Sequence, residues 1–238
     1  MTESVIAEKL LENGIPFAPA LPAMLKRYMD MLLEWNSRMD LTAVTDEAEI
    51  LDKHLVDSLS VLKTDWLFRE ARLIDVGTGA GLPGLLLAMA RPDLRVTLLD
   101  ALKKRLGFLQ AVCDDLGLQG VQIIHARAED GARQKDMREA FDVAAARAVA
   151  PLNVLCEYLL PYVAPGGLAL CWKGPALETE LSAGRKAAHV LGGRLEMPFS
   201  VTIAGREWGH RILPVRKVQR TPNTYPRKAG MPKGHPLA

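Results

Sequence analysis

Short apolar runs alternate with amphipathic stretches from Arg72 onward. They predict strands at residues 72–76, 95–99, 121–125, 141–147 and 168–172, and helices near 84–90, 101–116, 151–163 and 176–191. Chain breakers separate these elements, as in Arg91-Pro92-Asp93 and Pro165-Gly166-Gly167. Strands that alternate with helices are typical of a parallel sheet covered by helices.

Both ends of the chain depart from this alternation. Two strand-like runs, 194–203 and 210–218, flank a turn at Gly205 and predict a hairpin that closes the sheet antiparallel. The first seventy residues read as helical: Leu25, Tyr28, Met29 and Leu32 share one face of a helix that follows Leu21-Pro22, and Thr45 is the predicted N-cap of another. We therefore predict an N-terminal helical cap (1–70), a main domain (71–218) and a tail (219–238).

Composition is that of an ordinary globular protein. The 238 residues are 49% hydrophobic and 24% charged, enough for one substantial core. No apolar run approaches the ~20 residues that cross a bilayer, and the first thirty residues lack a signal peptide's apolar segment. A cytoplasmic protein without membrane contact is expected. Cys113, Cys156 and Cys171 lie in apolar stretches without C-x-x-C spacing, which predicts buried free thiols.

Charge is distributed unevenly along the chain. Residues 1–70 carry 7 Lys/Arg and 13 Asp/Glu, net −6, whereas residues 71–238 carry 23 and 15, net +8. A basic end on a near-neutral protein indicates a polyanionic partner, although a solvated tail explains the charge equally well. The residues that would contact such a partner are Arg216, Lys217, Arg220, Arg227, Lys228 and Lys233.

The most informative segment is a glycine-rich turn. Residues 73–84 read Leu-Ile-Asp-Val-Gly-Thr-Gly-Ala-Gly-Leu-Pro-Gly, a strand that leads into a turn and then a helix. Missing side chains let backbone N–H groups approach a ligand, and the helix N-terminus favours negative charge. The next strand ends at Asp100, whose carboxylate can accept hydrogen bonds from both hydroxyls of a ribose. A nucleoside cofactor is predicted.

Two cofactors fit this turn. Gly79, Gly81 and Gly84 satisfy the G-x-G-x-x-G pattern of NAD-binding dehydrogenases, which alone is a weak signal. Asp75 precedes the first glycine, where its charge would oppose a pyrophosphate but suits the ammonium group of S-adenosylmethionine. The methyl donor is favoured. A phosphate-binding P-loop is excluded because no lysine follows the glycines.

Motifs along nearly the whole chain resemble the glucose-inhibited division protein B family. In chain order they are Leu41-Thr42-Ala43, His54-x-x-Asp57-Ser58, Asp75 to Gly84, Leu99 to Arg105, Ala146-Arg147-Ala148, Lys173-Gly174 and Tyr225 to Pro232. The chain departs from the family pattern at Asp40, where Asn is usual, and at Gly234 and His235, where the family has lysines. These departures put in doubt the role of position 40 and the strength of RNA contact by the tail.

The resemblance implies an enzyme that methylates N7 of one guanine, expected to be guanine 527, in 16S ribosomal RNA of the small subunit, with S-adenosyl-L-methionine as methyl donor. It implies a class I (Rossmann-like) methyltransferase fold, an α/β architecture whose seven-stranded, mostly parallel sheet has its last strand antiparallel. Carried over by residue, it places Gly77 and Leu82 against the donor, Asp100 on its ribose, Ala128 and Glu129 beside its adenine, and Arg147 at the active face. With Asp75, Gly79 and Gly81, these form the predicted donor site.

Guanine N7 carries a free lone pair at neutral pH, so methylation there needs no general base. Arg147, at the expected tip of the fourth strand, is the predicted catalytic residue, with a structural ion pair as the alternative. His54 and Asp57 fit either an active-site role or a simple polar pair. The five histidines are too scattered for ligand spacing, so no metal site is predicted. A monomer is expected. An NAD-dependent oxidoreductase and a non-catalytic RNA-binding assembly factor remain as alternative functions.

Overall fold

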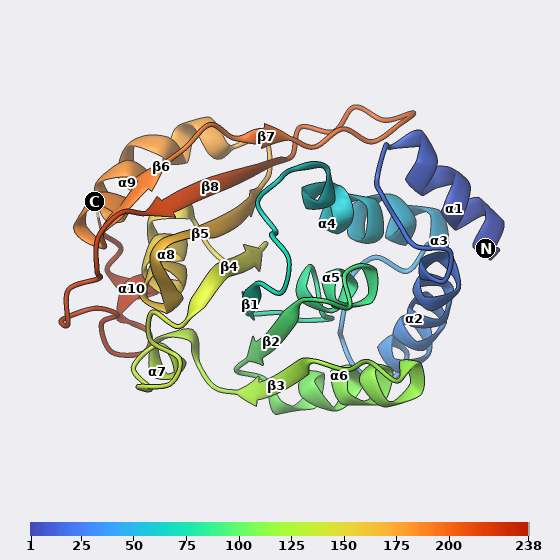
Figure 1. Ribbon diagram of the computed structural model, residues 1–238, viewed down its shortest axis with the longest axis horizontal. Helices are drawn as coiled ribbons and strands as arrows, with labels where there is room; N and C mark the ends of the chain where they lie inside the picture. Colours follow the sequence, from blue (N-terminus) through green and yellow to red (C-terminus); the bar gives the residue numbers. More distant parts are fainter. Residues whose placement is uncertain (238) are drawn as a thin grey trace.

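All the predicted strands lie in a single mixed sheet in the computed structural model, which describes residues 1–237 (Figure 1). The strands are β1 (Arg72–Val76), β2 (Arg95–Asp100), β3 (Val121–His125), β4 (Phe141–Arg147), β5 (Val163–Lys173), β6 (Gly193–Leu195), β7 (Phe199–Ser200) and β8 (Arg211–Lys217). Their order is β3-β2-β1-β4-β5-β8-β6, and β7 also pairs with β8. Strands β1 to β5 are parallel and β8 is antiparallel to β5, which confirms the predicted class I methyltransferase topology.

Helices cover both faces of this sheet. They are α1 (Glu3–Glu12), α2 (Leu21–Asn36), α3 (Glu47–Ile50), α4 (Asp57–Leu59), α5 (Gly84–Ala90), α6 (Lys103–Leu116), α7 (Ala128–Gly131), α8 (Leu152–Leu159), α9 (Leu177–Val190) and α10 (Met231–Gly234). A π-helical turn, Leu51–Val56, joins α3 to α4, and 3-10 turns span Ser60–Lys63 and Leu160–Tyr162. Within residues 1–237, no helix has the length and apolar character needed to cross a membrane.

Successive residues of the strands point to opposite faces of the sheet and pack in two separate hydrophobic cores. Leu73 of β1 joins a core that also contains residues of α1, α2, α5 and α6, whereas its neighbour Ile74 faces α8 and α9 on the other side of the sheet. Figure 1 shows α2 beside α6 at one end of the molecule, and α8, α9 and α10 at the other. The N-terminal helices thus share their core with the sheet.

Three sequence predictions need correction. Eight strands are present between residues 1 and 237 rather than seven, because the predicted strand 194–203 is divided into β6 and β7 near Pro198, which has no N–H to donate. Strand β5 begins at Val163 rather than 168, since the predicted breaker 165–167 forms a bulge within it. Asp46, not Thr45, is the N-cap of α3, and its Oδ1 accepts the Glu49 N–H at 2.9 Å.

Candidate methyl-donor and nucleobase site

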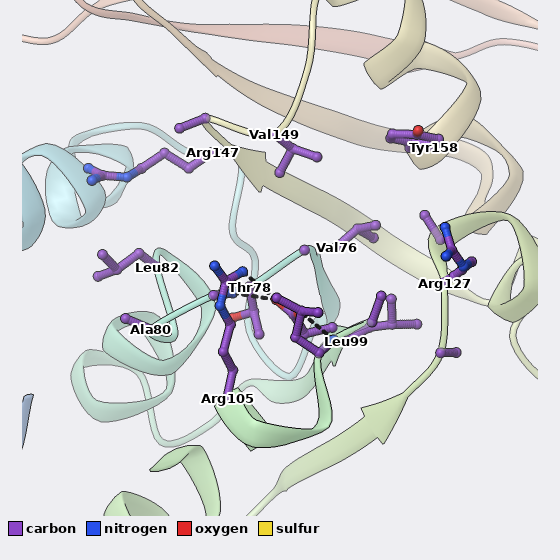
Figure 2. Close-up of a pocket in the computed structure, with 18 of the residues that line it drawn as sticks. Val76, Thr78, Ala80, Leu82, Leu99, Arg105, Arg127, Arg147, Val149 and Tyr158 are labelled. Carbon is purple, nitrogen blue, oxygen red and sulfur yellow. Dashed lines mark hydrogen bonds and ion pairs between the residues drawn. The ribbon is translucent and has the colours of Figure 1, made fainter. Parts of the chain in front are cut away.

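A cavity of about 940 Å³ opens at the carboxyl ends of β1, β2 and β4 (Figure 2). It is lined by the glycine turn after β1, the ends of β2 and β4, and parts of the N-terminal region and the tail, including Thr42, His54, Gly77, Thr78, Gly79, Leu82, Asp100, Arg105, Ala128, Glu129, Arg147, Tyr158, Gly230 and Lys233. Ligands of doubly wound sheets bind at this edge. Figure 2 shows Arg147, Ala80 and Leu82 on one side of the cavity, and Arg127 and Tyr158 on the other.

The glycine turn presents an open backbone to the cavity at Gly79. This residue has φ +58°, a left-handed conformation, and nothing lies within 4 Å of where its Cβ would stand. A ligand can therefore reach the backbone there, as predicted from the missing side chain. Gly84 serves a different purpose, because a Cβ there would meet Asp75 Cβ at 2.6 Å, so this glycine permits close packing of α5 on β1.

Asp75 and Gly81 lie behind the turn and are absent from the residues that line the cavity within 1–237. The Asp75 carboxylate is fully buried, and its Oδ2 accepts the Thr78 hydroxyl at 2.6 Å and the Gly84 N–H at 2.8 Å. Burial raises the pKa of Asp75 to about 6. Asp75 therefore stabilises the glycine turn through these two hydrogen bonds. A direct contact with the donor's ammonium group stays a prediction.

Asp100 stands at the end of β2 with its carboxylate fixed in place. Its Oδ2 accepts the Gly79 N–H at 2.9 Å, its Oδ1 accepts the Leu102 N–H at 2.8 Å, and the Arg105 guanidinium lies 3.6 Å from Oδ2. Each carboxylate oxygen has a further lone pair for a ligand hydroxyl. Asp100 is thus oriented before any ligand arrives, which suits the ribose contact expected of it.

The C-terminal tail closes the far side of the cavity, which sequence reasoning missed. Glu129, expected beside the adenine, is buried and accepts the Gly230 N–H at 2.8 Å through Oε1. Gly230 and Lys233 therefore line the same cavity as Ala128. The only sequence signal was the terminal Tyr225-to-Pro232 motif, which gives no hint of its distant partner.

Arg147 lies at the tip of β4, as predicted, and makes the ion pair considered as the alternative. Its Nη1 donates to Asp57 Oδ2 at 2.5 Å and to the Lys53 carbonyl at 2.6 Å, and its Nη2 donates to His54 Nδ1 at 2.9 Å. Arg147 still lines the cavity with its side chain 14% exposed. The structural role and the active-site role of Arg147 are therefore compatible, because the ion pair with Asp57 orients the guanidinium at the cavity wall.

Asp57 is the buried centre of this network. Its Oδ1 accepts the Trp208 Nε1–H at 2.9 Å and lies 3.1 Å from His210 Nδ1, on the segment between β7 and β8. Burial alone would raise the Asp57 pKa, but the hydrogen bond from His210 and the charge of Arg147 hold it below the usual value. Asp57 stays ionised, so it balances the Arg147 charge.

The basic residues predicted between Arg216 and Lys233 are less available to RNA than expected. Lys217 is wrongly assigned as an RNA contact, because it is fully buried and its Nζ donates to the Thr221 hydroxyl and pairs with Glu139 at 3.1 Å. Two further candidates are held by acids: Arg216 pairs with Glu196 and Arg227 with the buried Glu157. Arg220, Lys228 and Lys233 are exposed.

Comparison with known proteins places this arrangement in a family. The GidB family model, described as rRNA small subunit methyltransferase G, matches residues 22–206. Proteins named Ribosomal RNA small subunit methyltransferase G are 48% identical in Alkaliphilus oremlandii (strain OhILAs), over 99% of this chain and 98% of the relative, and 47% identical in Clostridium perfringens (strain 13 / Type A), over 88% of each.

Among solved structures, a mutant of MtNAS in complex with S-adenosylmethionine has a TM-score of 0.55 at 19% identity, covering 91% of this chain and 89% of that chain, a likeness of fold alone. The similarity in sequence goes further, because it runs through the glycine turn, the strand tips and the tail that together enclose the cavity. On that ground the chain belongs to the GidB family of small-subunit ribosomal RNA methyltransferases.

Proposed function

We propose that this protein transfers a methyl group from S-adenosylmethionine to N7 of one guanine, guanine 527, in 16S ribosomal RNA. The observation that carries the proposal is the pairing of an open glycine turn with an oriented carboxylate at Asp100 in one cavity. Family membership supplies the RNA substrate and favours this reading over an NAD-dependent oxidoreductase.

The cavity residues fit the donor along its length. Gly77 and Gly79 would contact its methionine part through the backbone, Asp100 would accept from the ribose hydroxyls, and Ala128 and Glu129 would flank the adenine. The open space at Gly79, which a Cβ would occupy, is the feature that supports this fit. When bound, the donor supplies an electrophilic methyl group on a sulfonium.

The surroundings of Arg147 suit a reaction that needs no proton transfer. Guanine N7 attacks with its own lone pair, so the protein contributes alignment and electrostatics. An unpaired guanidinium beside a sulfonium would repel it, but Asp57 lies 2.5 Å from Arg147 and cancels much of that charge. The Nε–H and the second Nη2–H of Arg147 make no hydrogen bond within residues 1–237, so they would orient an anionic or carbonyl group without opposing the donor.

The test is transfer of labelled methyl from S-adenosylmethionine to small subunits and to naked 16S RNA that both lack the modification. We expect label in N7-methylguanine, mapped to one position by cleavage at the methylated base. This design also shows whether free RNA or the assembled subunit is the substrate. Donor binding without transfer to either would instead support a non-catalytic assembly factor. A monomer acting in the cytoplasm, where ribosomal subunits are made, completes the proposal.

A further inference from the structure

Thr42 stands at the wall of the cavity on a loop that its neighbours hold in place. The Asn36 side chain makes three hydrogen bonds to this loop: Oδ1 accepts the Leu41 and Thr42 N–H groups at 2.8 and 3.0 Å, and Nδ2 donates to the Thr42 carbonyl at 3.0 Å. Thr42 lines the cavity together with His54 and Arg147. The hydroxyl therefore has a defined position next to the predicted catalytic residue.

The neighbouring histidine is locked in one tautomer. Arg147 Nη2 can only donate, so His54 Nδ1, at 2.9 Å, must accept. Burial, together with the charge of Arg147, lowers the pKa of His54 to about 4, which keeps the ring neutral at pH 7. The ring proton consequently lies on Nε2, which donates to the Thr42 hydroxyl oxygen at 2.8 Å.

The Thr42 hydroxyl oxygen has both lone pairs in use. It accepts from His54 Nε2 and, at 3.0 Å, from the Val44 N–H. Its own proton finds no acceptor in the part of the chain that the structure describes, residues 1–237. A hydroxyl has one donor and two acceptor positions, so Thr42 offers the cavity a donor and nothing else.

We propose that the Thr42 hydroxyl donates its hydrogen bond to O6 of the target guanine and thereby selects guanine over adenine. Guanine carries O6 and N7 on the same edge, both as acceptors, whereas adenine carries an amino donor in place of O6. A donor-only group beside the reacting N7 therefore favours guanine and faces an unmatched N–H in adenine. The inference rests on the proposed function and names the substrate contact within it.

The position of Thr42 favours the nucleobase over the methyl donor. Thr42 is linked through His54 to Arg147. Arg147 lies across the cavity from Arg127 and Tyr158, at the expected adenine end (Figure 2). Methylation places positive charge on the guanine ring and weakens O6 as an acceptor, so the hydrogen bond favours the bound substrate more than the transition state. Its loss should raise KM and leave kcat unchanged or slightly higher.

The experiment compares Thr42→Val, which keeps the shape without the hydroxyl, with Thr42→Ser, which restores the hydroxyl. Thr45→Val is the matched control, because Thr45 lies three residues away, is exposed and does not line the cavity. On unmodified substrate, we expect KM to rise about three- to tenfold for Thr42→Val from the lost hydrogen bond to O6, with Thr42→Ser and Thr45→Val near wild type. Valine also removes the acceptor of the His54 and Val44 N–H groups, and a substrate without O6 separates that effect from the contact with the base. Calorimetry should show unchanged affinity for S-adenosylmethionine in all three.

A second substrate carries 2-aminopurine in place of the target guanine and therefore lacks O6. With it, the experiment becomes a double-mutant cycle between the Thr42 hydroxyl and O6. Because 2-aminopurine also lacks the N1–H of guanine, wild-type enzyme should lose at least the same factor on this substrate, and Thr42→Val and wild type should have equal KM there. The proposal would be overturned if Thr42→Val and wild type had equal KM on the guanine substrate. It would also be overturned if Thr42→Val had a higher KM than wild type on the 2-aminopurine substrate. Weaker binding of S-adenosylmethionine by Thr42→Val would overturn it too, because the hydroxyl would then contact the methyl donor and not the guanine. If wild-type enzyme methylates no guanine N7, the proposed function itself fails, a result the wild-type arm shows separately.

Discussion

Replacing Asp57 by Asn tests whether the Arg147 network holds the N-terminal region on the sheet. The carboxylate accepts from Arg147 and Trp208 and lies within hydrogen-bond distance of His210, whereas a neutral amide has one acceptor oxygen and points an N–H₂ at a donor. Removing one partner of a buried ion pair costs about 3–5 kcal/mol. At about 2–4 °C per kcal/mol for a chain of this size, Tm should fall by about 6–20 °C.

Scanning calorimetry at pH 7 measures this change, and Asp115→Asn is the control. Asp115 pairs with Arg27 at 2.6 Å, but that Arg27 side chain is 51% exposed, so solvent screens the pair and its loss should barely move Tm. A fall in Tm for Asp57→Asn no larger than that of the control would refute the role assigned to the buried network.

The pH dependence gives an independent check of the same reasoning. The pKa of Asp57 is held below its ordinary value of 3.8 in the folded protein. Its stabilising effect is therefore complete above about pH 4 and is lost as pH falls through the folded pKa. The difference in unfolding free energy between wild type and Asp57→Asn should shrink as pH falls below about pH 4. A constant difference down to pH 3 would show that the charge of Asp57 is not responsible.

The remaining predictions concern the cavity. Gly79→Val places a side chain in the open space at a left-handed residue, and Asp100→Ala removes one or two charge-assisted hydrogen bonds, so calorimetry should show S-adenosylmethionine binding weakened roughly ten- to hundredfold by each; unchanged affinity in both would contradict the donor site. Arg147→Lys keeps the charge but loses the fork that reaches His54, so methyl transfer should fall at least tenfold, and full activity would remove Arg147 from the site. Truncation of 219–238 removes one wall of the cavity, so donor affinity should fall together with the salt dependence of RNA binding, and normal donor affinity in a folded truncated protein would show that this wall is dispensable.

Much of the fold was predictable because its signals are local. The strand at 72–76, the glycine turn and the acid at the end of the next strand are short-range patterns, and the structure places them as expected. The predicted strand 121–125 and helix 84–90 also have the bounds observed. Alternation and chain breakers carry enough information for such elements.

Long-range partners escaped the sequence argument. Asp57 and Arg147 are ninety residues apart, and nothing in either segment identifies the other as its counter-charge. The burial of Lys217 was missed for the same reason, since a lysine in a basic stretch looks solvated until Glu139 and Thr221 are seen beside it. Charge patterns describe composition along the chain, whereas burial depends on tertiary packing.

The anchoring of the glycine turn to α2 determines how far this protein can be shortened. The Tyr28 hydroxyl, fully buried, donates to the Ala80 carbonyl at 2.9 Å, and Leu25 and Leu32 of the same helix belong to the core that contains Leu85 and Leu109. Deleting the first helices would expose that core and free the loop that receives the donor. The chain should consequently unfold in one cooperative transition, and a fragment that begins after α2 should not retain donor binding.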